Sequence, residues 1–263
     1  MMNKNELNGI LSKHLIWLNN KTKGEGQAIL VGAHLHQACL QGAALRRAVL
    51  RRADLSGANL KGAGLKRADL SEANLNEVDL SQADLSRSDM SEAWLENALL
   101  VGANLRRSNL SEANLDGANA SQANFYHADC SGARFSRAVL AGAVLKEADF
   151  SECNLQEADL TGADLYNVNL NESNLQNARL DAANLIKANI SHIDLTGASL
   201  EGAHLNGADG YKARLHGANL RNADLTRVNF HKADLSEADL TGAILDGTIM
   251  PDGSVHQIAD QAG

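Results

Sequence analysis

Aliphatic residues recur along this chain at a strict interval of five. From Leu30 to Met250 every fifth residue belongs to one uninterrupted series of 45 positions, and leucine occupies 35 of them. A second series begins two residues earlier and runs from Ala28 to Thr248, and 36 of its 45 members are alanine. The residue directly before each member of the leucine series is Asp or Asn in 28 of 45 cases. Self-similarity at a fixed short period indicates a repeat architecture.

A period of five fits neither a regular helix nor a straight strand. Five residues of an α-helix advance by about 500°, so successive leucines would spiral around its axis. Five is also an odd number, so successive leucines on one strand would alternate between its two faces. Both conflicts disappear if the chain turns a corner in every unit, with the alanine and the leucine on the inside. Asp, Asn, Ser and Gly, which favour turns, are frequent at the other three positions.

The outward charges indicate how many units make one coil. Basic residues return every 20 residues, as at Arg47, Arg67 and Arg87, and so do glutamates, as at Glu72 and Glu92. A coil of about 15 residues would scatter these groups over three faces. The spacing therefore predicts a coil of 20 residues with four sides.

The unit resembles that of the pentapeptide-repeat family, which consists of a small residue, Asp or Asn, Leu or Phe, a polar residue and often Gly. The segments Ala53-Asp54-Leu55-Ser56-Gly57 and Ala113-Asn114-Leu115-Asp116-Gly117 show this pattern, which covers about 225 of the 263 residues. The resemblance implies an all-β fold, a right-handed quadrilateral β-helix with short strands on each side. The 45 units correspond to about 11 coils, and the rod would be roughly 54 Å long at about 4.8 Å per coil.

This architecture divides the chain into three parts. Residues 1–26 form an N-terminal capping helix and a linker, residues 27–250 form the solenoid, and residues 251–263 form a C-terminal tail or cap. A solenoid needs such caps because its ends expose strand edges and an open core.

The exceptions to leucine within the series predict volume compensation inside the core. Ala120, Phe125, Cys130 and Phe135 fill the four sides of one coil, with two large and two small side chains. Gly210 leaves space on its side, and Phe230 lies one coil further along the same stack. We interpret these Phe and Cys residues as packing residues.

The N-terminal segment is predicted to be a helix over residues 5–19. Its apolar residues follow a 3.6-residue period, and Asn3 or Asn5 would be the N-cap. We expect it to cover the first coil, with a partner-binding role as the alternative; the predicted apolar face consists of Leu7, Ile10, Leu11, His14, Leu15 and Leu18. At the other end Pro251 stops the repeat, and residues 254–262 would form a short turn or helix. A homodimer formed through one end of the rod is a further prediction.

Composition narrows the classes of function. The net charge of −8 argues against general nucleic-acid binding, which requires excess Lys and Arg. The three distant cysteines, Cys39, Cys130 and Cys153, favour a reducing compartment over a disulfide framework. No apolar run approaches the ~20 residues of a membrane span. We expect a cytoplasmic protein that binds neither nucleic acid directly nor membranes.

The sequence offers no recognisable catalytic or cofactor motif. It contains neither a Gly-rich phosphate loop, nor a nucleophile elbow, nor paired cysteines with metal-ligand spacing. His34 and His36 flank Leu35 and point outwards, but two ligands do not make a metal site. We therefore predict a protein without enzymatic activity, cofactor or metal.

The surface is predicted to carry two stripes of opposite charge. The basic stripe consists of Arg46, Arg47, Lys66, Arg67, Arg87, Arg106, Arg107, Lys146, Lys187 and Arg227. The acidic stripe, on the next side, consists of Asp69, Glu72, Asp89, Glu92, Glu112, Asp129, Asp149, Glu152 and Glu172. One interpretation is structural: the stripes pair laterally around a corner and keep the rod soluble. The other is DNA mimicry, because some members of the family protect type II topoisomerases with acidic rods; those rods are acidic on most sides, whereas this one has a basic stripe.

A small apolar patch is a second candidate for binding. Trp94 and Leu99 occupy places that usually hold Asp or Asn, and Val101, Val139 and Val144 are predicted to lie outside the core nearby. An exposed Trp with aliphatic neighbours is a typical interaction hot spot. The sequence therefore favours a rigid scaffold for an unidentified protein partner, with a DNA mimic that binds gyrase as the alternative.

Overall fold

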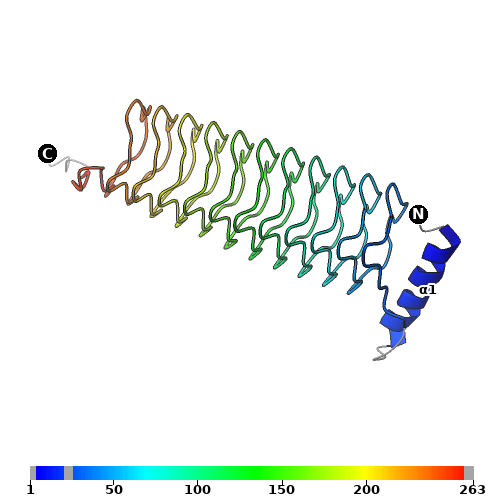
Figure 1. The fold of residues 1–263 in the computed structure, drawn as a ribbon. Helices are drawn as coiled ribbons and strands as arrows, with labels where there is room; N and C mark the ends of the chain where they lie inside the picture. Colours follow the sequence, from blue (N-terminus) through cyan, green and yellow to red (C-terminus); the bar gives the residue numbers. More distant parts are fainter. Residues whose placement is uncertain (1–3, 21–25, 258–263) are drawn as a thin grey trace.

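The protein is a rod of stacked coils with one helix at its N-terminal end (Figure 1). A computed structural model describes residues 4–20 and 26–257. Helix α1, Lys4–Asn20, lies across the first coil, and the chain then winds to the opposite end of the rod (Figure 1).

Parallel β-bridges fix the size of each coil. They join residues 20 apart, beginning with Ile29 and Val49 and continuing to Asn229 and Ile249. The predicted 20-residue coil with four sides is therefore confirmed. We name the sides after Leu50, Leu55, Leu60 and Leu65, and each side comprises the units at 20-residue intervals from that leucine.

The extended segments on each side are shorter than the short strands that the family resemblance implied. Between residues 26 and 257 each side contributes isolated bridges, and no continuous strand is formed. Two residues of every five are taken by a turn, which leaves too little extended chain for a ladder of several residues. The expected short strands are thus reduced to single bridged residues.

Every corner is a β-turn with one residue in the left-handed region. The carbonyl of each core leucine accepts a hydrogen bond from the N–H three residues later, as from Ala53 to Leu50 at 3.0 Å. Every fifth residue from Gly32 to Gly247 has φ between 53° and 74°. This geometry is that of a type II turn. No β-branched residue stands in this series, in agreement with the steric cost of positive φ for such side chains.

Where Asp or Asn precedes the core residue, it stabilises the corner that follows. Its side-chain oxygen accepts a hydrogen bond from the N–H two residues later, as Asp69 does from the Ser71 N–H at 3.1 Å. Such Asx turns explain why these residue types dominate this position.

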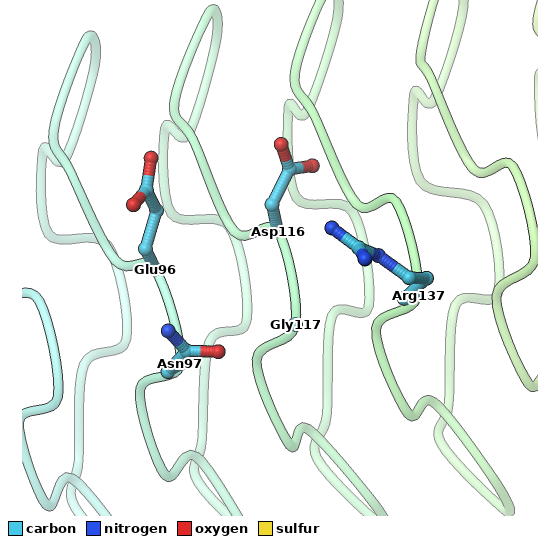
Figure 2. Close-up of a pocket in the computed structure, with 5 residues that line it drawn as sticks. All are labelled: Glu96, Asn97, Asp116, Gly117 and Arg137. Carbon is cyan, nitrogen blue, oxygen red and sulfur yellow. The ribbon is translucent and has the colours of Figure 1, made fainter.

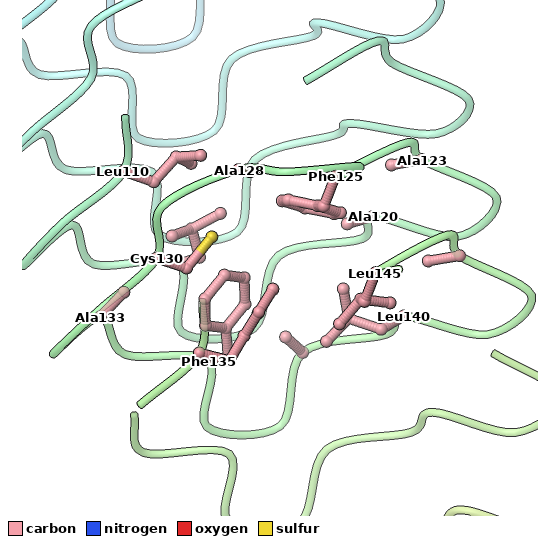
Figure 3. Close-up of a cluster of buried hydrophobic side chains, with 14 of the residues drawn as sticks. Leu110, Ala120, Ala123, Phe125, Ala128, Cys130, Ala133, Phe135, Leu140 and Leu145 are labelled. Carbon is pink, nitrogen blue, oxygen red and sulfur yellow. The ribbon is translucent and has the colours of Figure 1, made fainter. Parts of the chain in front are cut away.

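The core is one continuous stack, mostly of leucine and alanine, in the predicted register, and Figure 3 shows one part of it. Phe125, Phe135 and Phe150 form an aromatic cluster with ring centroids 5.2–6.3 Å apart, and Cys130 lies beside it. A Cβ at Gly210 would lie 2.8 Å from the Phe230 ring. Glycine is therefore required at residue 210 because the phenylalanine of the next coil fills its space.

Helix α1 packs on the first coil through a face that differs in part from the prediction. Leu7 and His14 are buried, and the N–H of Ala28 donates a hydrogen bond to His14 Nδ1 at 3.0 Å. Trp17 stacks on His14 with 5.4 Å between ring centroids. Leu15, expected on this face, is 48% exposed. Because the surface of the helix is curved, only the side chains near His14 reach the first coil. Leu15 points beyond the edge of this contact and stays exposed.

The predicted helix start is also corrected in part. Because α1 begins at Lys4, Asn5 lies within the helix and is not its N-cap, whereas Asn3 lies outside the described residues. Among the described residues, no helix is long and apolar enough to cross a membrane.

The C-terminal end is closed less completely than the N-terminal end. Residues 251–252 form a turn, and Val255 then forms an antiparallel bridge with Ile249. The segment therefore folds back as a short hairpin over one edge of the last coil, and the rest of the expected turn or helix, residues 258–262, lies outside the described residues. Leu235, Leu240 and Leu245 remain only partly buried.

Candidate protein-interaction surface

The acidic stripe lies along the Leu50 side, and its first two members are neutralised. Arg52 donates two hydrogen bonds to Glu72, at 2.8 Å from Nε and 3.0 Å from Nη2. The hydrogen bond from Arg52 lowers the pKa of Glu72. Arg51 lies 3.4 Å from Asp69. The negative charge of the stripe that is not paired with arginine therefore lies on the coils that follow Glu72.

The remaining acidic residues have two different roles. Asp89, Asp129 and Asp149 each accept hydrogen bonds from the N–H and hydroxyl of the serine two residues later, so they hold the turns. Glu92 and Glu152 stand at left-handed turn positions and form no ion pair with a described cation. The same holds for Glu112 and Glu172. These four glutamates are the part of the stripe available to a partner.

The predicted lateral pairing of the two stripes is wrong for the described residues. Six of the eight ion pairs among the described residues run along the rod between residues 18 or 20 apart, as in Arg134–Asp116 and Arg214–Asp194. The aspartates of the acidic stripe turn towards their own corners, as Asp89 does towards Ser91, and therefore do not reach around to the basic stripe. Some basic residues find aromatic partners instead: Arg106 lies 4.7 Å from the Tyr126 ring centroid, and Lys146 lies at the same distance from that of Tyr166.

The predicted apolar patch separates into two parts. Trp94 and Leu99 are 59% and 44% exposed and belong to one coil, Trp94 on the Leu55 side and Leu99 on the Leu60 side. Val101 follows on the Leu60 side and is half-buried. Val139 lies two coils from Leu99, with Asn119 bridged between them. Val139 is half-buried, as is Val144 on the Leu65 side, so Trp94 and Leu99 carry most of the exposed apolar surface.

A cavity lies at the corner between Trp94 and Leu99 (Figure 2). It has a volume of about 440 Å³, and three successive coils contribute its lining residues, Glu96, Asn97, Asp116, Gly117 and Arg137. None of these residues was identified from the sequence. In the sequence each of them is a typical residue of its repeat position. Only the stacking of three coils brings them together around one cavity.

The cavity is polar and its walls are partly fixed. Asp116 accepts a hydrogen bond from the N–H of Ser136 at 2.9 Å and forms an ion pair with Arg134. The side-chain amide of Asn114 donates to the Glu96 carboxylate. In Figure 2 the Arg137 guanidinium extends along the rod from the neighbouring coil towards Asp116. This arrangement offers both donors and acceptors, which suits hydrogen bonding to a polypeptide.

The two outward histidines flagged in the sequence do not form a metal site in the structure. His36 shares a hydrogen bond with Ser56 at 2.8 Å between Nδ1 and Oγ. Within residues 4–20 and 26–257, no group of three or more His, Cys, Asp or Glu is placed to hold a metal ion.

Comparisons with known proteins agree with the repeat pattern. The family model for pentapeptide repeats matches eight overlapping segments, the first covering residues 28–67 and the last residues 213–250. No curated protein matches the chain.

Several solved structures are similar to it. HetL, a pentapeptide repeat protein involved in heterocyst differentiation regulation in the cyanobacterium Nostoc sp. strain PCC 7120, is 36% identical, with 97% of this chain and 100% of HetL covered and a TM-score of 0.42. A pentapeptide repeat protein from the Arabidopsis thaliana thylakoid lumen is 31% identical over 38% of this chain and 67% of that one, with a TM-score of 0.34. QnrB1, a plasmid-mediated fluoroquinolone resistance protein, is 20% identical over 72% of this chain and 91% of its own, with a TM-score of 0.47.

Proposed function

This chain belongs to the pentapeptide-repeat family, and on that premise we propose that it is a non-enzymatic scaffold that binds a protein partner at the corner formed by Trp94 and Leu99. The observation that carries the proposal is the 59% exposure of Trp94 at a repeat position that holds Asp or Asn in 28 of 45 units. A large aromatic side chain in water has no structural benefit for the corner, whereas Trp is among the commonest anchors of protein interfaces.

The surroundings of Trp94 fit an interface. Leu99 extends the apolar surface to the adjacent side, and the cavity between them supplies polar groups. Interfaces combine such an apolar centre with a polar rim of hydrogen bonds. Coil stacking holds the corner rigid, so little conformational entropy would be lost on binding.

The non-enzymatic part of the proposal follows from the shape of the surface. The corners of a solenoid project into solvent, and the cavities between stacked corners are open, so a substrate bound there would stay in contact with water. Most catalysis requires a site that excludes it.

The test compares two variants in a capture experiment from the native host. Trp94→Ala combined with Leu99→Asn removes the anchor and restores the residue type usual at position 99. Val31→Asn is the control, because Val31 is also an exposed apolar residue, at 53%, but lies on the first coil. We expect the double variant to bind the captured, purified partner at least tenfold more weakly, since hot-spot truncation costs about 2 kcal/mol or more.

Equal binding by the double variant and the wild type would exclude this corner as the interface. Equal loss in the control would show that binding follows exposed apolar area in general and not this site.

A second candidate function is supported by the free glutamates of the acidic stripe. Glu92, Glu112 and Glu152 share one side of the rod at coil-multiple spacing, and none of them forms an ion pair within 4 Å among the described residues. Such a row would imitate the charge of a nucleic-acid backbone towards the DNA-binding groove of a type II topoisomerase. The basic stripe on the neighbouring corner weakens this candidate, because it would repel the same groove.

A charge-matched comparison separates the two functions. Changing Glu92, Glu112 and Glu152 to Gln removes three charges from the acidic stripe, and changing Glu77, Glu157 and Glu237 to Gln removes three from the Leu55 side at the same turn position. A DNA mimic would protect gyrase from a quinolone in a supercoiling assay, and only the first variant would lose this protection. Absence of protection by the wild type would rule out the mimic and leave the scaffold untouched.

A further inference from the structure

The N-terminal half of the basic stripe is free of ion pairs. Its members belong to four successive coils and lie at the corner that leads from the Leu65 side to the Leu50 side. None of them lies within 4 Å of a described carboxylate. They are Arg46, Arg47, Lys66, Arg67, Arg87, Arg106 and Arg107. Elsewhere on the rod six arginines do form such pairs. This corner therefore concentrates positive charge that the protein itself does not neutralise.

A cavity of about 240 Å³ opens in the middle of this charge. It is lined by Lys66, Ser86, Arg87, Asn104, Arg106 and Arg107, so its walls contain no carboxylate. Asp84 is the carboxylate nearest in sequence, and one of its oxygens already accepts hydrogen bonds from the Ser86 N–H at 3.1 Å and the Asn104 amide at 3.0 Å.

Ser86, like Thr196, departs from the commonest pattern at its repeat position, and of the two only Ser86 lines this cavity. Ser56, Ser71 and Ser91 stand at the same place in their units, and each donates its hydroxyl to the preceding Asp at 2.6–2.8 Å. Ser86 also follows an aspartate two residues earlier, yet its hydroxyl has no partner among the described residues, although the residue is only 7% exposed. Buried hydroxyls are nearly always hydrogen-bonded, so one left free beside a cavity indicates a group that the cavity accommodates.

The chemistry of the walls defines that group. Guanidinium and ammonium groups only donate, and arginine forks match the oxygens of phosphate in pairs. The Arg106 guanidinium lies against the Tyr126 ring, which limits its freedom on one face. We propose that this cavity is a binding site for a phosphate group, either as free phosphate or as a phosphomonoester, with Arg87, Arg106 and the Ser86 hydroxyl as its principal donors.

The site is independent of the proposed scaffold interface. The cavity belongs to the corner after the Leu65 side, whereas Trp94 and Leu99 flank the corner after the Leu55 side. A variant at one corner therefore leaves the other intact, and each proposal can fail alone.

Isothermal titration of the full chain with inorganic phosphate and with O-phospho-L-serine, at low ionic strength, tests the proposal. Arg87→Gln with Arg106→Gln should weaken binding at least tenfold, because charge-assisted hydrogen bonds are the strong ones. Ser86→Ala should weaken it severalfold. Added salt should weaken binding by the wild type.

Two controls locate the effect. Arg137→Gln with Arg227→Gln removes two unpaired arginines away from the cavity, and Ser111→Ala removes a hydroxyl at the equivalent position on the Leu50 side. Both should bind like the wild type, and the arginine variants should keep the wild-type melting temperature because the altered side chains are exposed. Tighter binding of phosphoserine than of phosphate would identify a monoester as the ligand, and equal binding would identify the free anion.

Three results would overturn the site. They are the absence of binding by either probe at about 10 mM, which is weaker than any functional affinity would require, an unchanged affinity in Ser86→Ala, and an equal loss in the arginine control pair.

Discussion

The second residue after each core leucine carries a conformational cost at the corners where it is not glycine. It lies in the left-handed region throughout the solenoid, although it is often Glu, Arg or Gln and not glycine. This conformation costs a residue with a Cβ roughly 1–2 kcal/mol. The repeat tolerates the cost because stacking fixes the corner, and the long side chains placed there supply the charges of the surface.

Ala182 offers a direct measurement of this cost. Its φ is 53° and it is exposed, so it has no other evident role. Ala182→Gly should raise the free energy of unfolding by about 0.5–1 kcal/mol, since relief of strain exceeds the entropy that glycine adds to the unfolded chain. Ala182→Val should lower it by about 1 kcal/mol or more. Urea denaturation of the three proteins gives the comparison, and a destabilising glycine would refute the strain argument.

Inward and outward positions should differ sharply in their tolerance. Leu115 is completely buried, so Leu115→Asp places an uncompensated carboxyl in the stack and should cost several kcal/mol. Glu112, three residues earlier, is exposed, and Glu112→Ala should change stability by no more than about 0.5 kcal/mol. Thermal melts of both variants check the register, which would be wrong if the two were equally tolerated.

At the scale of elements, α1 and the C-terminal hairpin protect the two ends unequally. The helix covers the first coil and satisfies the Ala28 N–H through His14. The hairpin pairs one edge of the last coil through Val255 and leaves several core leucines partly exposed. The ends of this solenoid are therefore where local unfolding should begin.

The docking of α1 should depend on pH through His14. Burial lowers the pKa of His14 below its usual 6.5. The folded state therefore binds fewer protons than the unfolded state, so this contribution is present above about pH 6.5 and is lost as the pH falls towards the folded pKa. Protonation would also place a hydrogen on Nδ1 against the Ala28 N–H.

Fluorescence of Trp17, which stacks on His14, reports this transition. In a Trp94→Phe background, Trp17 is the single tryptophan. We expect its emission to shift as the pH is lowered from about 8 to 5, in the range where histidine titrates and most carboxylates do not. His14→Gln keeps an acceptor but does not titrate, so the shift should disappear; its persistence would mean that another group controls the helix.

For the whole molecule, each coil contacts only its neighbours, so stability should be nearly additive along the rod. The bridges between residues 20 apart show that the coil is the structural unit. Whether the rod ends also mediate a homodimer stays a prediction, which the oligomeric state in solution would decide.

Removing one whole coil tests this additivity. Deletion of residues 161–180 joins Leu160 to Asp181, which preserves both the five-residue register and the sides of all later residues. This variant should unfold cooperatively with a melting temperature close to that of the wild type. Deletion of residues 161–178 instead places Leu180 two residues after Leu160, and it should be markedly less stable. Equal melting temperatures would mean that the register carries little of the stability.

The sequence alone determined the inward register, the 20-residue coil and the space for Phe230 at Gly210. The strict period of five places the leucines of the series inside, and the recurrence of outward charges sets the coil at 20 residues, so these features need no knowledge of distant contacts. The resemblance to a known family rests on the same positions, and the family model matches those residues.

Only the tertiary structure decided how the outward side chains are used. Every corner residue has a neighbour on the coil before and the coil after, and long side chains can reach either through several rotamers. Sequence spacing thus could not show that Arg52 turns to Glu72 along the rod, that Leu15 misses the first coil, or that the Ser86 hydroxyl is left without a partner. Whether a side chain is buried follows from its position within the repeat, so the sequence predicts it. The contacts of outward side chains depend instead on which two residues the stacking of coils brings together.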